Sequence, residues 1–230
     1  MPPKLVLILA NGHWPQAGPS TSVLQEADFI IAANGGWAKA RIYQIPVDLV
    51  VGDLDSLRAK DLTALRASGT KTLVYPREKD KTDLEIALDY ALSLRTTRVV
   101  IVGALGDRLD HTLVNTLLLE KAARAGVFIE IENGEERVFV VNDRLCLEEA
   151  EKGDLVSLLP ISEVVEGVQT KGLRFSLEHE SLTRSSSRGV SNVVSSVPVQ
   201  IHIEKGLLLV VHQDRQRLRN RSSAGCISER

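Results

Sequence analysis

The stretch Val51-Gly52-Asp53-Leu54-Asp55-Ser56 decides how the rest of the chain is interpreted. It ends the apolar run 49–51, which is β-branched and does not alternate with polar residues, as expected of a buried parallel strand. In an extended segment residues i and i+2 project to the same side, so we expect Asp53 and Asp55 to face one point. Two carboxylates that face one point need a cation or must share a proton. The alternative is turn chemistry, in which Asp55 or Ser56 caps a helix that begins near Leu57.

Around this stretch, the first two thirds of the chain alternate apolar strands with helical patterns. We expect strands at residues 5–10, 28–33, 48–51, 72–75, 98–102 and 127–131, and helices at 36–43, 57–68, 83–94 and 109–125. Strands that alternate with helices predict a parallel sheet covered on both faces. Two helices have clear end signals, because residues 82–85 fit a capping box and Gly126 suits the position after a helix C-terminus.

After residue 134 the helical periodicity disappears. Short strands recur there, at residues 137–141, 154–159, 172–177, 197–203 and 207–212, which indicates a small all-β unit. We therefore expect an α/β domain over residues 1–134 and an all-β domain over 135–214. The arginine-rich residues 215–230 have little apolar content and are expected to form a disordered tail, with a basic interaction arm as the alternative.

Composition excludes several classes of protein. Hydrophobic residues make up 43% and charged residues 25%, which is ordinary for a soluble globular protein, and a net charge of -2 argues against a nucleic-acid binder. Cys146 and Cys226 form no C-x-x-C motif, so neither a zinc site nor a disulfide framework is indicated. The sequence has no signal peptide and no long apolar run, which favours a cytoplasmic protein without a membrane partner. It also has no P-loop and no G-x-G-x-x-G motif.

Four polar clusters each follow a predicted strand at its carboxyl end, namely residues 34–36, 52–56, 80–83 and 103–111. The ligand crevice of an open α/β sheet lies outside those ends, so we expect the fold to gather the clusters at one edge. Mg²⁺ prefers a few carboxylates together with substrate phosphate oxygens. The candidate carboxylates are Asp53, Asp55 and Asp83, with Asp110 as a fourth.

The same clusters contain groups that suit a polyphosphate. Lys81 and Arg108 can offset phosphate charge. Helix N-termini at Thr82 and Leu109 present favourable dipole ends. Backbone N–H groups can approach an anion at four glycines, which are Gly35, Gly36, Gly103 and Gly106.

Each of these residues also has a structural alternative. Thr82 and Asp83 can cap and charge a helix N-terminus, and Asp110 can be an N-cap. His111 can be a structural histidine that makes hydrogen bonds rather than a base. The argument for a site therefore rests on the four clusters together.

At these residues the chain resembles the thiamine pyrophosphokinase family. The family motifs occur in order, as a D-G-G-like turn at residues 34–36, G-D-x-D-S at 52–56, D-x-T-D at 80–83 and G-x-x-G-x-R-x-D-H at 103–111. In the second half, residues 172–177 resemble the family's G-L-x-W-x-L strand and residues 189–192 its G-x-S-N-E turn. Three positions depart from the pattern: Asn34 stands for aspartate, Phe175 for tryptophan and Val193 for glutamate.

The resemblance implies an α/β catalytic domain followed by a β-sandwich that helps bind thiamine, in a homodimer with sites between subunits. It also implies transfer of a diphosphate group from ATP to the hydroxyethyl group of thiamine, with release of AMP and with Mg²⁺ held by Asp53, Asp55 and Asp83. The implied catalytic residues are Asp53, Asp55, Asp83 and Asp110; the nucleotide- and phosphate-binding residues are Gly35, Gly36, Lys81, Thr82, Gly103, Gly106, Arg108 and His111; and the thiamine-binding residues are Asn34, Ser191 and Asn192.

Two other functions stay open from the sequence. The D-x-D motif also occurs in nucleotide-sugar glycosyltransferases, so another metal-dependent transferase is one alternative. The second is a thiamine or nucleotide binder without catalytic activity, which the replacement of aspartate by Asn34 suggests.

Overall fold

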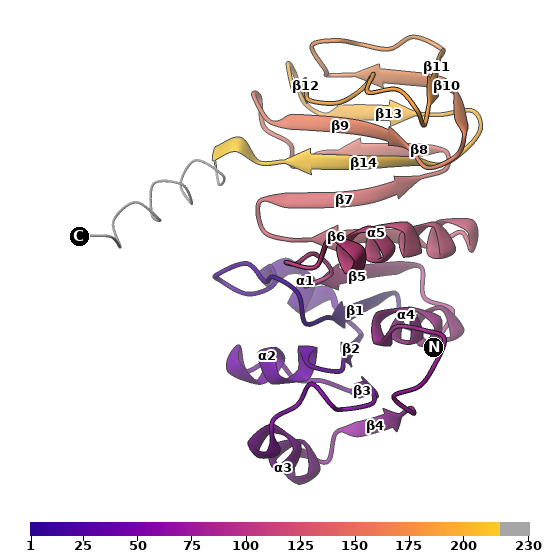
Figure 1. Ribbon diagram of the computed structural model, residues 1–230. Helices are drawn as coiled ribbons and strands as arrows, with labels where there is room; N and C mark the ends of the chain where they lie inside the picture. Colours follow the sequence, from indigo (N-terminus) through magenta and orange to yellow (C-terminus); the bar gives the residue numbers. More distant parts are fainter. Residues whose placement is uncertain (217–230) are drawn as a thin grey trace. The chain divides into compact units, whose positions relative to one another are not determined.

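The computed structural model describes residues 1–216 and divides the chain into two compact units, Met1–Asn133 and a second that begins at Gly134 (Figure 1). Apart from its first two residues, the tail predicted at 215–230 lies outside the described residues. Within the described part of the chain, none of the helices has both the length and the apolar character needed to cross a membrane.

The first unit is built on a six-stranded parallel sheet. Its strands are β1 (Leu5–Leu9), β2 (Phe29–Ala33), β3 (Leu49–Gly52), β4 (Lys71–Val74), β5 (Arg98–Val102) and β6 (Phe128–Glu132), in the order β6-β5-β1-β2-β3-β4. All five residues of β1 are buried, because an inner strand of a parallel sheet is covered on both faces. The predicted parallel sheet is therefore confirmed.

Helices cover both faces of this sheet (Figure 1). They are α1 (Thr21–Glu26), α2 (Gly36–Ile42), α3 (Ala59–Ser68), α4 (Asp83–Ser93) and α5 (Leu109–Arg124). Side chains of α1, α2 and α3 share one core with the odd-numbered residues of β1. The buried face of α4 packs against β1, β2 and β3 on the other side. The short helix α1 was missed by the sequence analysis, although Ser20 is its N-cap.

The observed helix N-termini show that two of the predicted capping alternatives are wrong. Helix α3 begins at Ala59 behind Arg58, so Asp55 and Ser56 do not cap it. Helix α5 has Arg108 at its N-cap position and carries Asp110 in its first turn, so the N-cap interpretation of Asp110 is also wrong. The capping prediction for α4 is confirmed, because the Thr82 hydroxyl oxygen accepts a hydrogen bond from the Glu85 N–H at 3.1 Å.

The second unit consists of two antiparallel sheets packed around a shared apolar core. One sheet has the order β12-β9-β14-β7, from Asn192–Val193, Leu155–Pro160, Leu208–Gln213 and Glu136–Val141. The other has the order β11-β10-β13-β8, from Glu180–Thr183, Val164–Lys171, Val199–His202 and Arg144–Leu147. An α/β domain followed by an all-β sandwich is thus the observed fold class. The strand predicted at residues 172–177 is wrong, since that segment contributes a single bridge between Leu173 and Val194.

Helix α2 starts against the end of β1 at a distance that only glycine allows. A Cβ atom at Gly36 would lie 2.0 Å from the Leu9 carbonyl oxygen, which belongs to the sheet and cannot move cheaply. At Gly106 the nearest atom to such a Cβ would be 3.4 Å away, in ordinary van der Waals contact.

We therefore expect Gly36→Ala to lower the free energy of unfolding by about 1–3 kcal/mol, because overpacking against backbone forces a shift of the helix or strand. The matched control Gly106→Ala should change it by less than about 0.5 kcal/mol. Urea unfolding at equilibrium measures both values, and equal stabilities of the two variants would show that the contact at Gly36 does not constrain the fold.

Candidate active site

A cavity of 510 Å³ opens in the first unit at the carboxyl ends of the strands. It lies beside β1, where the chain reverses its direction of strand addition: β2 pairs with one edge of β1 and β5 with the other. The loops after β1 and β5 line it and are joined by a hydrogen bond of 2.8 Å from the Gly12 N–H to the Gly103 carbonyl. A topological switch point of this kind is where open α/β sheets bind ligands.

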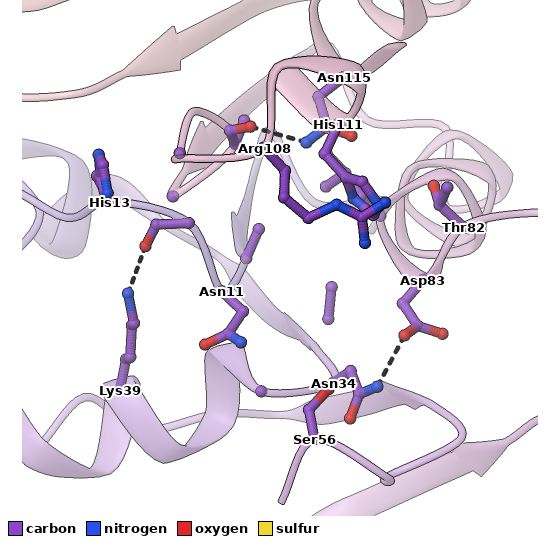
Figure 2. A pocket seen from close by; sticks show the side chains of 18 of the residues that line it. Asn11, His13, Asn34, Lys39, Ser56, Thr82, Asp83, Arg108, His111 and Asn115 are labelled. Carbon is purple, nitrogen blue, oxygen red and sulfur yellow. Dashed lines mark hydrogen bonds between the residues drawn. The ribbon is translucent and has the colours of Figure 1, made fainter. Parts of the chain in front are cut away.

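Three carboxylates from two segments meet around the side-chain amide of Asn34, which follows β2: Asp53 and Asp55 come after β3, and Asp83 begins α4. Figure 2 shows the contact between Asn34 and Asp83. The Asn34 Nδ2 atom lies 2.8 Å from Asp53 Oδ1, 2.8 Å from Asp83 Oδ2 and 3.3 Å from Asp55 Oδ1. Asn34 is only 5% exposed, and the Asp53 and Asp83 side chains are 12% and 21% exposed, so the contacts to these two carboxylates are largely shielded from water. An amide nitrogen has two hydrogens, so it cannot satisfy three acceptors fully. The cluster therefore concentrates negative charge beside the cavity, which is lined by Asn34 and Asp83 but not by Asp53 or Asp55.

The backbone at the end of β3 allows these groups to approach so closely. Gly52 has a φ of 145°, and a Cβ atom there would lie 2.9 Å from Asn34 Cβ and 3.1 Å from Asp83 Cγ. Leu54 has a φ of 62°, so the segment from Asp53 to Asp55 is a left-handed turn and not an extended strand. The extended geometry that we expected for the D-x-D motif is therefore wrong, although both carboxylates reach the same amide.

Lys79 supplies positive charge to the cluster and was missed by the sequence analysis. Its Nζ atom lies 3.1 Å from Asp83 Oδ1 and 3.4 Å from Asp53 Oδ2, and its side chain is 14% exposed. Burial opposes the charge of Lys79, but contact with the two carboxylates outweighs it and raises the pKa of Lys79. Burial likewise opposes ionisation of Asp53, while the Asp55 N–H and the Lys79 ammonium together lower the pKa of Asp53.

The residues fit a hard divalent cation in chemistry, since carboxylate oxygens are the ligands that Mg²⁺ prefers. Within residues 1–216, however, no three His, Cys, Asp or Glu side chains form a ready-made metal cluster. Asn34 Nδ2, a hydrogen-bond donor, lies at the point where the carboxylates meet. Asn34 Oδ1 is buried and has no hydrogen-bond partner, so rotation of the amide by half a turn would direct an oxygen toward that point instead.

Cationic side chains line another part of the cavity (Figure 2). Arg108 binds Asp110 through two nitrogens, and this hydrogen-bonded pair lowers the pKa of Asp110. His111 lies one turn along the same helix and also lines the cavity. Lys39 also lines the cavity; its ammonium donates to the Gly12 carbonyl oxygen, and partial burial lowers the pKa of Lys39. Neither Lys39 nor the loop after β1 was singled out from the sequence.

The remaining predicted residues of the first unit have different surroundings. Lys81 is directed to Asp89, with Nζ 2.7 Å from Oδ2, and does not line the cavity. A Cβ atom at Gly103 would collide with Trp14, so that glycine permits close packing. The Gly106 N–H donates to the Thr112 hydroxyl oxygen at 3.1 Å. The anion-binding roles expected of these residues stay predictions.

The two predicted thiamine-binding residues of the second unit differ in their burial and in their hydrogen-bond partners. Asn192 is buried, and its side chain accepts a hydrogen bond from the Phe175 N–H at 3.0 Å and donates to the Phe175 carbonyl at 2.6 Å. Ser191 is exposed in a left-handed conformation with a φ of 59°, and its backbone N–H donates to the Ser157 hydroxyl oxygen. Asn192 therefore stabilises the segment around Phe175, while the Ser191 side chain faces solvent.

Two family models match this chain. Residues 20–131 match the model described as "Thiamin pyrophosphokinase, catalytic domain", and residues 144–208 match "Thiamin pyrophosphokinase, vitamin B1 binding domain". The chain belongs to the thiamin pyrophosphokinase family. The catalytic-domain match contains the Asn34 amide, Lys79 and the three carboxylates of the cluster. The second match of this family contains Ser191 and Asn192.

Individual relatives agree with the family assignment. Thiamine pyrophosphokinase of Bacillus subtilis is 28% identical over 168 residues, which cover 73% of this chain and 78% of the relative. The crystal structure of the Bacillus subtilis enzyme superimposes with a TM-score of 0.81 at 24% identity, over 91% of this chain and 99% of that one. The thiamin pyrophosphokinase of Geobacillus thermodenitrificans gives a TM-score of 0.76 at 25% identity, over 91% and 97% of the two chains.

Asn34→Asp tests whether the amide holds the carboxylates together. The substitution replaces the shared donor with a fourth carboxylate, so without divalent cations we expect the free energy of unfolding at pH 7 to fall by about 1–3 kcal/mol. Mg²⁺ should stabilise the variant more than the unsubstituted protein, because a bound cation favours the folded state. Urea unfolding with EDTA and with Mg²⁺ measures both effects. Unchanged stability in EDTA would exclude the amide as a structural contact of the cluster.

Proposed function

We propose that this protein transfers a diphosphate group from ATP to thiamine, giving thiamine diphosphate and AMP. The observation that carries the proposal is the meeting of Asp53, Asp55 and Asp83 beside a cavity at the switch point of a parallel sheet. Such a position suits a nucleotide, and such a charge cluster suits the cation that accompanies its phosphates. Membership of the thiamin pyrophosphokinase family supports thiamine as the acceptor.

In the proposed reaction the hydroxyl oxygen of thiamine bonds to the β-phosphorus of ATP. The bond from that phosphorus to the oxygen bridging the α- and β-phosphates breaks, its electron pair leaves with AMP, and the hydroxyl proton passes to solvent water. Mg²⁺, when held by Asp53, Asp55 and Asp83, supplies neutralisation of phosphate charge. The protein takes little direct part in making and breaking bonds, so positioning and electrostatic stabilisation account for most of the acceleration of the reaction.

The cationic side chains of the cavity have a matching role. Arg108 offers a planar fork that binds phosphate oxygens through two nitrogens, and Lys39, which also lines the cavity, offers a point charge. Asp110 holds the Arg108 guanidinium through the paired hydrogen bonds and so orients it. A polyphosphate between Arg108 and Lys39 would have cations on two sides while its metal-binding oxygens face the carboxylates.

The second unit contributes the thiamine contacts in this proposal, with Ser191 as the residue that touches the substrate. Family resemblance supports a homodimer in which thiamine binds between subunits, and sedimentation velocity of the purified protein tests that state. A thiamine or nucleotide binder without turnover is the second candidate, because Asn34 places an amide nitrogen where the carboxylates meet. Formation of AMP and thiamine diphosphate from ATP and thiamine distinguishes the enzyme from the binder.

The carboxylates are tested by Asp53→Asn and Asp83→Asn. Each change removes one charge from the cluster without removing volume, so we expect the rate of AMP formation to fall at least about 100-fold while the fold persists. Asp89→Asn is a matched control, because Asp89 lies on the same helix as Asp83 but pairs with Lys81 and Lys121. Chromatographic separation of AMP, ADP and ATP measures the rate, and full activity of either cluster variant would refute the assignment.

Ser191 and Asn192 should respond differently to truncation. Ser191→Ala removes a single hydroxyl that faces solvent, so we expect the KM for thiamine to rise about 2–10-fold with little change in stability. Asn192→Ala leaves the buried backbone groups of Phe175 without partners and should lower the free energy of unfolding by about 1–3 kcal/mol. Steady-state kinetics and urea unfolding of both variants check the contrast, which would be lost if Ser191→Ala left the KM unchanged.

A further inference from the structure

Lys79 lies among the carboxylates that the proposed function assigns to the metal. Its ammonium contacts Asp53 and Asp83, and it also donates to the Pro76 carbonyl oxygen at 3.3 Å. The ammonium thus has acceptors on several sides and is largely shielded from solvent. A cation in this position does the work of a counter-ion, since it offsets the repulsion between carboxylates that face one another.

A divalent cation bound to the same carboxylates would lie close to the Lys79 ammonium. Mg²⁺ contacts its ligands at distances near 2 Å, so an ammonium that stays in contact with Asp53 and Asp83 would be a close like charge. Each cation therefore weakens the binding of the other. Arg77 does not replace Lys79 in this respect, because it is 84% exposed and reaches only Asp55, at 3.5 Å.

We propose that Lys79 makes the binding of the divalent cation dependent on the nucleotide. In the metal-free protein the ammonium neutralises the cluster through Asp53 Oδ2 and Asp83 Oδ1, the oxygens that the Asn34 amide does not contact, so a cation at the Asn34 point must bind beside a like charge. A nucleotide brings phosphate oxygens that can accept the displaced ammonium, so metal and nucleotide bind cooperatively while metal alone binds weakly. Lys79 is a positioning residue in this scheme, and the inference rests on the proposed function because it takes the nucleotide as the second ligand.

The chain offers a close control for this proposal in Lys81. It lies two residues further along the same segment and carries the same charge, but its Nζ atom contacts Asp89 at 2.7 Å. Removal of Lys81 changes the net charge of the protein as much as removal of Lys79 does. Only Lys79 contacts the cluster, so a difference between the two variants reports on contact and not on overall charge.

The test is isothermal titration of the full chain with Mg²⁺, and with Mn²⁺ followed by electron paramagnetic resonance, in the absence of nucleotide. Lys79→Met should bind the cation at least tenfold more tightly than the unsubstituted protein, and Lys79→Gln, which guards against misfolding of the first variant, should change in the same direction. Lys79→Arg, which keeps the charge, and Lys81→Met should both stay within about threefold of the unsubstituted protein. Circular dichroism verifies that each variant is folded.

A second titration with a non-hydrolysable ATP analogue measures the coupling. The analogue should raise the cation affinity of the unsubstituted protein more than that of Lys79→Met, because the ammonium no longer has to be displaced in the variant. Equal or weaker cation binding by Lys79→Met without nucleotide would overturn the proposal, and so would an equal gain in Lys81→Met. Failure of the unsubstituted protein to bind the analogue would instead count against the proposed function, since the cation titrations contain no nucleotide.

Discussion

Mutual repulsion among Asp53, Asp55 and Asp83 is the constraint on which the rest of the site depends. Three carboxylates beside one atom are stable only if donors and cations offset their charge. In this structure the Asn34 amide and the Lys79 ammonium do so, at distances between 2.8 and 3.4 Å. The carboxylates are therefore close enough together to bind a divalent cation, but in this structure they already have partners in the Asn34 amide and the Lys79 ammonium.

The close approach of these groups depends on the backbone as much as on the charges. Gly52 leaves room for Asn34 and Asp83, and the left-handed turn at Leu54 directs both neighbouring aspartates to one side. Parallel strand order then adds the second half of the site, because the loops after β1 and β5 become neighbours only when β5 pairs with β1. The cavity is therefore lined by Asn34 and Asp83 of the charge cluster, by Lys39 of α2, and by Arg108 and His111 after β5.

Two of the departures from the family pattern, Asn34 and Phe175, have physical consequences that the structure makes visible. An aspartate at position 34 would add a fourth carboxylate, whereas Asn34 supplies a donor and a neutral oxygen that can exchange places by rotation. In the second unit, the amide of Asn192 supports the backbone on both sides of Phe175, whose side chain is 64% exposed. An exposed ring on a fixed backbone can cover a flat ligand whether the ring belongs to phenylalanine or to tryptophan.

The fold class followed from the sequence alone. Apolar strands that alternate with amphipathic helices before residue 134 favour a covered parallel sheet, and the short strands after it favour an all-β sandwich. The sequence also indicated that Asp53, Asp55 and Asp83 belong together, because motifs at strand ends are gathered by any parallel sheet. Asp110, the fourth carboxylate that we expected there, pairs with Arg108 instead. The sequence alone does not show that Lys79 contacts the carboxylate cluster while Lys81 contacts Asp89. The direction of each side chain depends on where α4 begins, at Asp83. Nor could the sequence identify Lys39 or the loop after β1, because their place beside the cavity follows from strand order, which is set by packing between distant parts of the chain.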